Sequence, residues 1–129
     1  MDLSLTQEQL LIQDTARRFA ESELAPQAEA LDQSKDREIL KSHCRQLSEL
    51  GFMGLNVSAE YGGSEAGSIA FSLAITELAK ACASTAVTVS VTNMVAEVIQ
   101  AMGSDEQKRT YLPKLCDGSY LAGSFCLTE

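Results

Sequence analysis

The side chains that could do chemistry are few and lie far apart in this sequence. The single histidine, His43, has no serine, cysteine or carboxylate placed to form a nucleophilic triad with it. Glu60, Glu77 and Glu97 are isolated carboxylates rather than a spaced acid–base pair. We interpret His43 as a structural histidine, at the surface or partly buried, and we expect Glu97 to pair across the fold or at a subunit contact. The residues therefore predict no catalytic group in this chain.

Metal and phosphate sites are not indicated either. The four cysteines form no C-x-x-C pair and have no histidine at metal-ligand spacing, so we predict no metal site. Each cysteine lies in an apolar stretch, so we expect it to be buried and to pack like a small hydrophobic residue. We also expect the thiols to be reduced, as in a cytoplasmic compartment. The paired glycines Gly62 and Gly63 lack the spacing of a phosphate-binding loop.

Composition and charge exclude several classes of partner. A chain of 129 residues with 45% hydrophobic residues is long enough for one domain with a core. Its net charge of −8 argues against a nucleic-acid partner, which needs a basic surface. No apolar run approaches the length of a membrane span, so we expect no membrane partner.

Helical periodicity and capping residues predict an all-α fold, a bundle of about five helices. Thr6 and Gln9 form a capping-box pattern, Pro26 should end or kink the first helix, and Gly51 lies where a left-handed cap residue belongs. In the third helix we expect Glu77 to face outward or toward a partner. The predicted helices are at about residues 6–24, 37–50, 68–82, 84–102 and 104–115.

The fourth helix carries two conflicting signals. Residues 86–92 alternate like a strand and are rich in β-branched side chains. The apolar residues from Val87 to Met102 nevertheless keep a helical period over more than four turns, so we predict helix. Because this helix is apolar nearly all round, we expect it to be the central, buried one.

The end of the sequence has a different character. Residues 123–129 combine a small residue, an aromatic, a leucine and a threonine after two glycines, which predicts a strand. A lone strand is not stable by itself, so we expect a helical domain at 1–120 followed by the start of a β domain at 121–129, with the sequence cut at the junction.

Short motifs follow one another along the whole chain: LTQEQ at 5–9, ARRFA at 16–20, ELAP at 23–26, LGFMGL at 50–55, EYGG at 60–63, ELA at 77–79, GSDEQK at 103–108, YLP at 111–113 and FCLTE at 125–129. Taken in this order, they resemble the motifs of the acyl-CoA dehydrogenases. Ser58 and Ala59 depart from the proline and acid common before the family's Tyr-Gly-Gly loop, and Gly67 is displaced from the glycine usual after it.

The resemblance implies a three-domain flavoenzyme with FAD, of which this chain supplies the helical N-terminal domain. Such enzymes oxidise the α–β bond of an acyl-CoA thioester: a glutamate base takes the α proton and the β hydrogen leaves as hydride to the flavin. The electrons then pass to an electron-transfer flavoprotein. Homotetramers are common in the family. The resemblance implies that the catalytic glutamate and the phosphate-binding residues lie outside this sequence.

The resemblance also implies two sets of site residues. The cofactor-binding set is Phe125, Leu127 and Thr128. The alternative interpretation is that these residues belong to an ordinary edge strand with no cofactor contact. The substrate-binding set on the fourth helix is Val87, Ser90, Val91 and Met94. The alternative interpretation is that these side chains only pack in the core. No lysine or arginine lies there to hold a second carboxylate, so an uncharged acyl group is expected.

Two other functions stay open at this point. An acyl-CoA oxidase or a flavin monooxygenase of the same fold would differ in what reoxidises the flavin. A stand-alone helical interaction module would be a non-catalytic protein.

Overall fold

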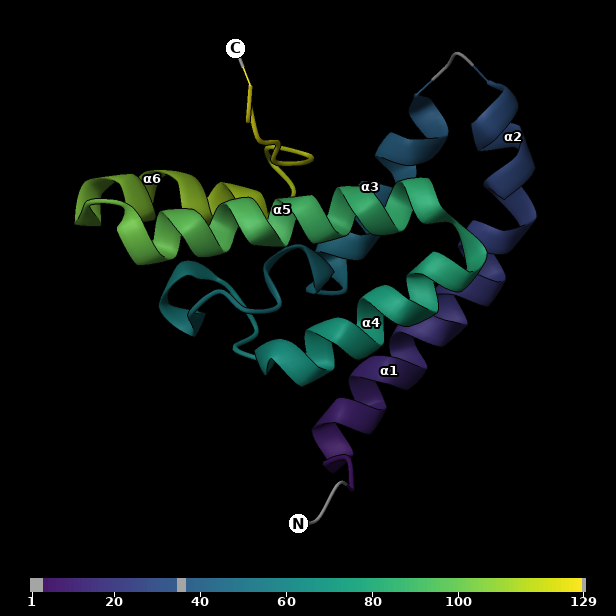
Figure 1. The fold of residues 1–129 in the computed structure, drawn as a ribbon, viewed down its shortest axis with the longest axis horizontal. Helices are drawn as coiled ribbons and strands as arrows, with labels where there is room; N and C mark the ends of the chain where they lie inside the picture. Colours follow the sequence, from purple (N-terminus) through teal and green to yellow (C-terminus); the bar gives the residue numbers. More distant parts are fainter. Residues whose placement is uncertain (1–3, 35–36, 129) are drawn as a thin grey trace.

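The computed structural model describes residues 4–34 and 37–128, and within these ranges the chain is helical with no strand. The all-α prediction is therefore confirmed. Six α-helices are joined by short 3-10 and π-helical segments (Figure 1). Their bounds are α1 Gln7–Phe19, α2 Ala28–Gln33, α3 Glu38–Glu49, α4 Gly67–Ala81, α5 Ala83–Met102 and α6 Asp105–Cys116.

The first helical arm begins and bends where the sequence predicts. The Thr6 hydroxyl accepts the Gln9 N–H at 3.2 Å, and the Gln9 side chain accepts the Thr6 N–H at 2.9 Å, which completes the capping box. After α1 the chain passes through a π-helical turn at Ala20–Leu24 and a 3-10 turn at Ala25–Gln27 before α2. Pro26 lies in that 3-10 turn, where its missing N–H interrupts the α-helical ladder.

A compact loop connects α3 to α4. Gly51 closes α3 with a φ of +81°, as predicted, and the 3-10 turns Phe52–Gly54 and Ala59–Tyr61 follow. The loop folds back on itself through hydrogen bonds from the Ser64 N–H to the Gly54 carbonyl, at 3.0 Å, and from the Ala66 N–H to the Leu55 carbonyl, at 2.7 Å. Gly54 lies directly against Cys116 of α6, so a side chain at this position would collide with the thiol.

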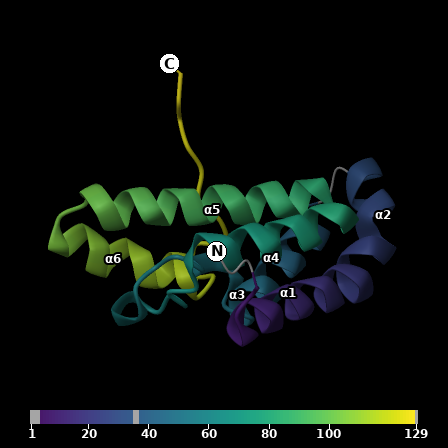
Figure 2. The same ribbon diagram turned by 60° about the horizontal axis from the view of Figure 1, so that its bottom comes forward.

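The helices pack in two groups. In Figure 1, α1 and α4 lie side by side, and α5 runs across the molecule with α6 beside it. Figure 2 shows the same pairs from another side. The main core includes Leu24, Leu47, Met53 and Leu78, all fully buried. A smaller cluster between the loop, α5 and α6 is built from Val57, Ala96, Leu112, Leu115 and Cys116.

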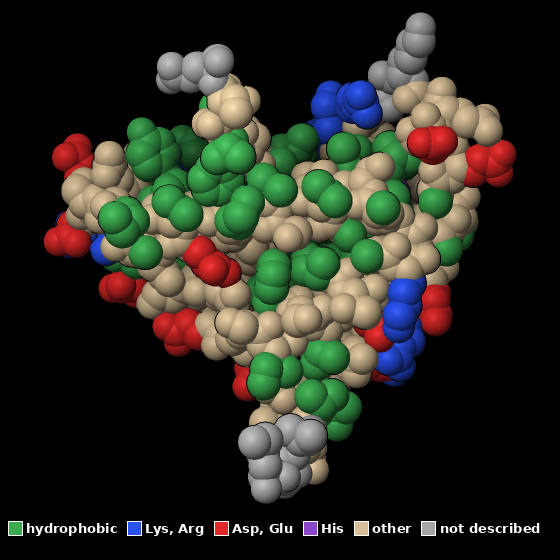
Figure 3. Space-filling view, in the orientation of Figure 1, with side chains coloured by type: hydrophobic (Ala, Val, Ile, Leu, Met, Phe, Trp, Pro, Cys, Tyr) green, Lys and Arg blue, Asp and Glu red, His purple; other side chains and the backbone are tan. Residues whose placement is uncertain are grey.

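The prediction of helix for residues 84–102 is confirmed, but the prediction that this helix is central and buried is wrong. Its large aliphatic side chains form an exposed row along α5, visible in Figure 3: Val87, Met94, Val98 and Met102 are 60%, 47%, 44% and 83% exposed. The buried side of α5 carries small and polar residues instead, namely Thr85, Ala86, Val89, Thr92, Asn93 and Ala96. One reason is that the neighbouring loop turns backbone groups of Phe52 and Leu55 toward α5, and the Asn93 side chain binds them.

Residues 121–128, which we call the C-terminal tail, leave the helices beside α5 (Figures 1 and 2). They form neither helix nor strand, so the predicted strand is not formed among the described residues, which offer it no partner strand. The domain boundary at 120/121 stays a prediction. Glu129, the last residue of the predicted flavin motif, lies outside the described residues.

Candidate functional site

The four predicted substrate-binding residues lie on one side of α5. Their spacing of three, one and three positions places Val87, Ser90, Val91 and Met94 on a common face of a helix. Val87 and Met94 are exposed, and Ser90 and Val91 are half-buried between them. The exposure of Val87 and Met94 contradicts ordinary core packing for these two side chains. Their contact with an acyl chain stays a prediction.

The predicted cofactor-binding residues lie in the C-terminal tail. Phe125 is 44% exposed and Leu127 is 89% exposed, and Thr128 is also exposed. The tail is tied to α5 by a hydrogen bond from the Gly123 N–H to the Thr92 hydroxyl at 3.1 Å. The structure therefore ties the segment that leads into Phe125 to the helix that carries the predicted substrate-binding residues.

The inner side of α5 is held by a buried amide that the sequence analysis missed. Asn93 is fully buried, and its side-chain oxygen accepts the Leu55 N–H at 2.8 Å. Its side-chain NH₂ group donates to the Phe52 carbonyl at 2.8 Å and to the Val89 carbonyl at 3.0 Å. An asparagine within the apolar helical pattern of residues 87–102 was the available signal, since buried amides are retained where they satisfy backbone groups.

Further along α5, two more polar side chains bind the same loop. Gln100 accepts the Ser58 N–H at 2.7 Å and donates to the Asn56 carbonyl at 3.3 Å. Glu97 accepts from the Asn56 side chain at 2.6 Å, which confirms the expectation that it pairs across the fold. Together with Asn93 these residues fix the rotation of α5 about its axis.

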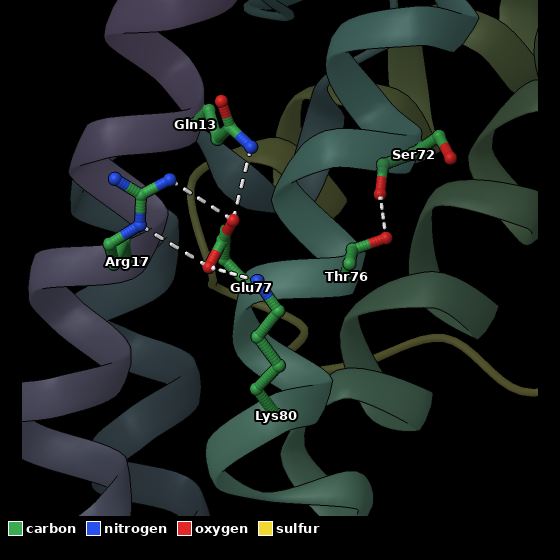
Figure 4. Close-up of polar contacts among 6 residues, drawn as sticks. All are labelled: Gln13, Arg17, Ser72, Thr76, Glu77 and Lys80. Atoms are coloured by element: carbon green, nitrogen blue, oxygen red, sulfur yellow. Dashed lines mark hydrogen bonds and ion pairs between the residues drawn. The ribbon is translucent and has the colours of Figure 1, made fainter.

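Glu77 is the one buried carboxylate among the described residues, with 3% exposure. It joins α4 to α1, accepting from Arg17 at 3.3 Å, from Gln13 at 3.1 Å and from Lys80 at 3.0 Å (Figure 4). The prediction left open whether Glu77 faces outward or toward a partner; it faces α1. These hydrogen bonds, first from Arg17 and then from Lys80, lower the pKa of Glu77 below its ordinary value. Its role is therefore structural.

His43 is buried, with 1% exposure, so the prediction of a surface or partly buried histidine is wrong. Its Nδ1 lies 3.4 Å from the Thr85 hydroxyl, and its ring meets Phe19 edge to face at 6.4 Å. Burial lowers the pKa of His43, against a smaller opposing effect of Glu23. A neutral histidine wedged between α1, α3 and α5 is a packing element rather than a catalytic base.

The cysteines divide into buried and exposed thiols. Cys44, Cys82 and Cys116 are buried, as predicted, whereas Cys126 in the tail is exposed, so the prediction of burial is wrong there. Burial raises the pKa of the Cys116 thiol to about 11. Within residues 4–34 and 37–128, no three metal-ligating side chains come together, and no helix is long and apolar enough to cross a membrane.

Comparison with known proteins places this geometry in a family. The family described as "Acyl-CoA dehydrogenase, N-terminal domain" matches residues 6–119. The chain is 38% identical to the acryloyl-CoA reductase (NADH) of Anaerotignum propionicum, a match that covers 100% of this chain and 32% of that protein. The chain spans about a third of the length of the curated relatives it matches.

Solved structures show the same fold. A chain in the structure of the electron transferring flavoprotein of Acidaminococcus fermentans superposes with a TM-score of 0.82 at 34% identity, covering 92% of this chain and 31% of that one. Butyryl-CoA dehydrogenase from Megasphaera elsdenii gives a TM-score of 0.78 at 31% identity, covering 92% of this chain and 32% of its own. With the family match over residues 6–119, these likenesses show that the chain belongs to the acyl-CoA dehydrogenase family.

Proposed function

We propose that this chain is the helical N-terminal part of an FAD-dependent acyl-CoA dehydrogenase that oxidises the α–β bond of an acyl-CoA to give the 2-enoyl-CoA. One observation carries the proposal: the helix that bears the exposed apolar face, α5, also binds the exposed tail, through the hydrogen bond from Gly123 to the buried Thr92. Family resemblance assigns the face to the substrate and the tail to the flavin. A surface that serves only packing inside this chain would not leave Val87 and Met94 open.

In this proposal the acyl chain lies against Val87, Val91 and Met94. Each apolar group that leaves water on binding contributes about 25 cal/mol per Å² of buried surface. Ser90 is the short side chain within this face and leaves room for the acyl group. The four positions carry no charge, which supports an uncharged acyl substrate. The residues of this chain thus bind and orient the thioester and exclude water from it.

The tail has the groups that a flavin ring needs. Phe125 offers an exposed aromatic face and Thr128 an exposed hydroxyl. Among the described residues, no hydrogen bond joins the amides of 124–128 to the helices, so their N–H groups are available as donors. When bound, FAD supplies the two-electron oxidation of the carbon–carbon bond. In this proposal Phe125 and Leu127 pack on the ring, and the Leu127 backbone and the Thr128 hydroxyl bond its pyrimidine side.

An electron-transfer flavoprotein is the proposed electron acceptor, supported by the likeness to a chain in the Acidaminococcus fermentans structure. A homotetramer completes the proposal on family grounds, and a cytoplasmic location is proposed because the four cysteines are free thiols. The same site could work in the reverse direction, because one relative with 38% identity is named acryloyl-CoA reductase (NADH). Reduction of a 2-enoyl-CoA is therefore the second candidate function.

The test uses the protein as its own gene encodes it. We expect a yellow protein with a flavin spectrum that reduces an artificial electron-accepting dye when acyl-CoA thioesters of graded length are added. Oxygen consumption without the dye would identify an oxidase, and NADH oxidation driven by an enoyl-CoA would identify the reductase. A colourless protein that acts on no acyl-CoA would overturn the proposal and leave the helical interaction module.

A further inference from the structure

Thr92 is a buried threonine whose hydroxyl has two partners. Its side chain is fully buried, and its Oγ1 donates to the Thr88 carbonyl at 2.7 Å within α5. The same oxygen accepts the Gly123 N–H from the tail at 3.1 Å. A hydroxyl has one proton to donate and lone pairs to accept, so Thr92 uses both capacities at once. It is therefore a direct link between α5 and the tail.

Gly123 brings the tail backbone onto α5 at the same point. A Cβ on Gly123 would lie 3.1 Å from the Cβ of Val95 and 3.2 and 3.3 Å from its two methyl carbons. Because such contacts are tighter than ordinary packing, any larger residue would push the tail away from Val95. Val95 is adjacent to Met94 and one turn beyond Val91, so the tail crosses α5 beside the predicted acyl-binding face.

The anchor at Thr92 is the last one before the flavin motif. Leu121 packs against the main core just upstream. Beyond Gly123, no hydrogen bond among the described residues ties 124–128 to the helices. Phe125 follows two residues later, within about 7 Å of chain. The placement of the motif relative to α5 is thus set where Gly123 meets Thr92.

We propose that Thr92 is a positioning residue that sets the distance and angle between the flavin-contacting tail and the acyl-binding face of α5. This inference rests on the proposed function. The acyl group and the flavin must meet in a reactive geometry, and a displacement of about 1 Å can cost 10²-fold in rate. One helix that holds the acyl chain on its outer face and the tail through Thr92 keeps the two in register. In this proposal the hydroxyl acts through the tail, because it is buried and already bonded to Thr88 and Gly123.

The decisive variant is Thr92→Val, which keeps the shape of the side chain and removes the hydroxyl. Thr92→Ser restores the hydroxyl. Thr88→Val is the matched control, because the Thr88 hydroxyl donates to the Ser84 carbonyl at 2.9 Å, one turn earlier on α5, and does not reach the tail. Gly123→Ala disturbs the same contact from the other side without changing α5.

The first readout needs no flavin. In the protein as its own gene encodes it, freed of flavin, amide exchange of Gly123 followed by NMR should accelerate about tenfold in Thr92→Val, the loss expected for one hydrogen bond. Thr92→Ser and Thr88→Val should leave it within about twofold of the parent. Unchanged Gly123 exchange in Thr92→Val would overturn the inference, whatever the protein's activity. If Thr92→Val does not fold, Gly123→Ala gives the same test, because the amide at position 123 should lose its hydrogen bond to Thr92 and exchange about tenfold faster.

The second readout uses the flavin-loaded protein. We expect Thr92→Val and Gly123→Ala to lower kcat about tenfold, to change KM for acyl-CoA by less than about twofold, and to shift the flavin absorption bands. Thr92→Ser and Thr88→Val should have the kcat, the KM and the flavin absorption bands of the parent. A parent without flavin would refute the proposed function and leave the exchange result standing. A parent that is active while Thr92→Val keeps its kcat and spectrum would overturn this inference alone.

Discussion

Asn93 and Leu55 are 38 positions apart in the sequence, and the buried side-chain oxygen of Asn93 accepts the Leu55 N–H at 2.8 Å. With its two donated bonds to Phe52 and Val89, this amide holds the α3–α4 loop against α5. The loop carries much of the main core, including Phe52, Met53 and Leu55. One amide therefore connects the orientation of α5 to the packing of the domain.

Replacing Asn93 by alanine should destabilise the domain strongly. The Leu55 N–H and the Phe52 carbonyl would be left buried without partners, and each such group costs about 1–3 kcal/mol. We expect a loss of about 3 kcal/mol in the free energy of unfolding, measured by urea titration. Met94→Ala, at an exposed position next in sequence, should change it by less than about 1 kcal/mol. Equal effects of the two substitutions would contradict the role given to Asn93.

Glu77 should make stability depend on pH in the acid range. Its pKa lies below its ordinary value of 4.5 in the folded chain, because Arg17 and Lys80 bind the carboxylate. The stabilisation is fully present above pH 4.5 and is lost as the pH falls through the lowered pKa. The free energy of unfolding, measured by urea titration, should therefore change less between pH 6 and pH 3 in Glu77→Gln than in the parent.

The matched control for Glu77 is Asp14→Asn, at a carboxylate that pairs with Arg18 on the surface at 2.7 Å. Exposed ion pairs contribute little to the free energy of unfolding, so Asp14→Asn should show the same dependence of stability on pH as the parent. A profile of Glu77→Gln that follows the parent at every pH would show that the Arg17 contact does not tune the carboxylate.

Thiol labelling should separate Cys126 from the other three cysteines. Cys126 is exposed, whereas burial raises the pKa values of Cys44 and Cys116 and also shields Cys82. At pH 8 the native chain should react rapidly with one equivalent of a maleimide, and with four after unfolding in denaturant. Cys126→Ser should abolish the rapid phase. Rapid modification of that variant would mean that Cys44, Cys82 or Cys116 is accessible to the reagent.

Ser90 should control the length of the acyl group if the proposed function is correct. Ser90→Leu would fill the space between Val87, Val91 and Met94. We expect kcat/KM for longer acyl-CoA substrates to fall about tenfold or more relative to butyryl-CoA, because a pocket discriminates methylene groups by about 1–3 kcal/mol. Ser84→Leu, at an exposed position in the first turn of α5, should leave the substrate profile unchanged. If Ser84→Leu changed kcat/KM for the same substrates by the same factor, the acyl group would not lie against Ser90.

The capped helices could be predicted from the sequence because their signals are local. Thr6 with Gln9 and Ser104 with Gln107 form complete capping boxes in the structure, and the pairs lie three residues apart. Residues 86–92 are helical despite their strand-like alternation. The helical spacing of apolar residues extends over 87–102, and packing over that length outweighs the β-propensity of a few residues.

The buried side of α5 could not be predicted from hydrophobicity. That measure assigns Val87, Met94 and Val98 to the core, yet Asn93 and Thr92 occupy it because backbone groups of the loop and the tail need partners. Those partners come from residues 38 and 31 positions away, which no local pattern reveals. The placement of the four acyl-face candidates on one side did follow from helical spacing alone.

The division of α5 into a polar inner side and an apolar outer side has a consequence for how such a protein can change. Substitutions at Val87, Ser90 or Met94 alter the outer surface without touching the hydrogen bonds of Asn93 and Gln100. Under the proposed function, ligand preference and folding would thereby depend on different side chains of one helix. The outer side could then be changed to suit another acyl group without loss of the bonds that hold the domain together.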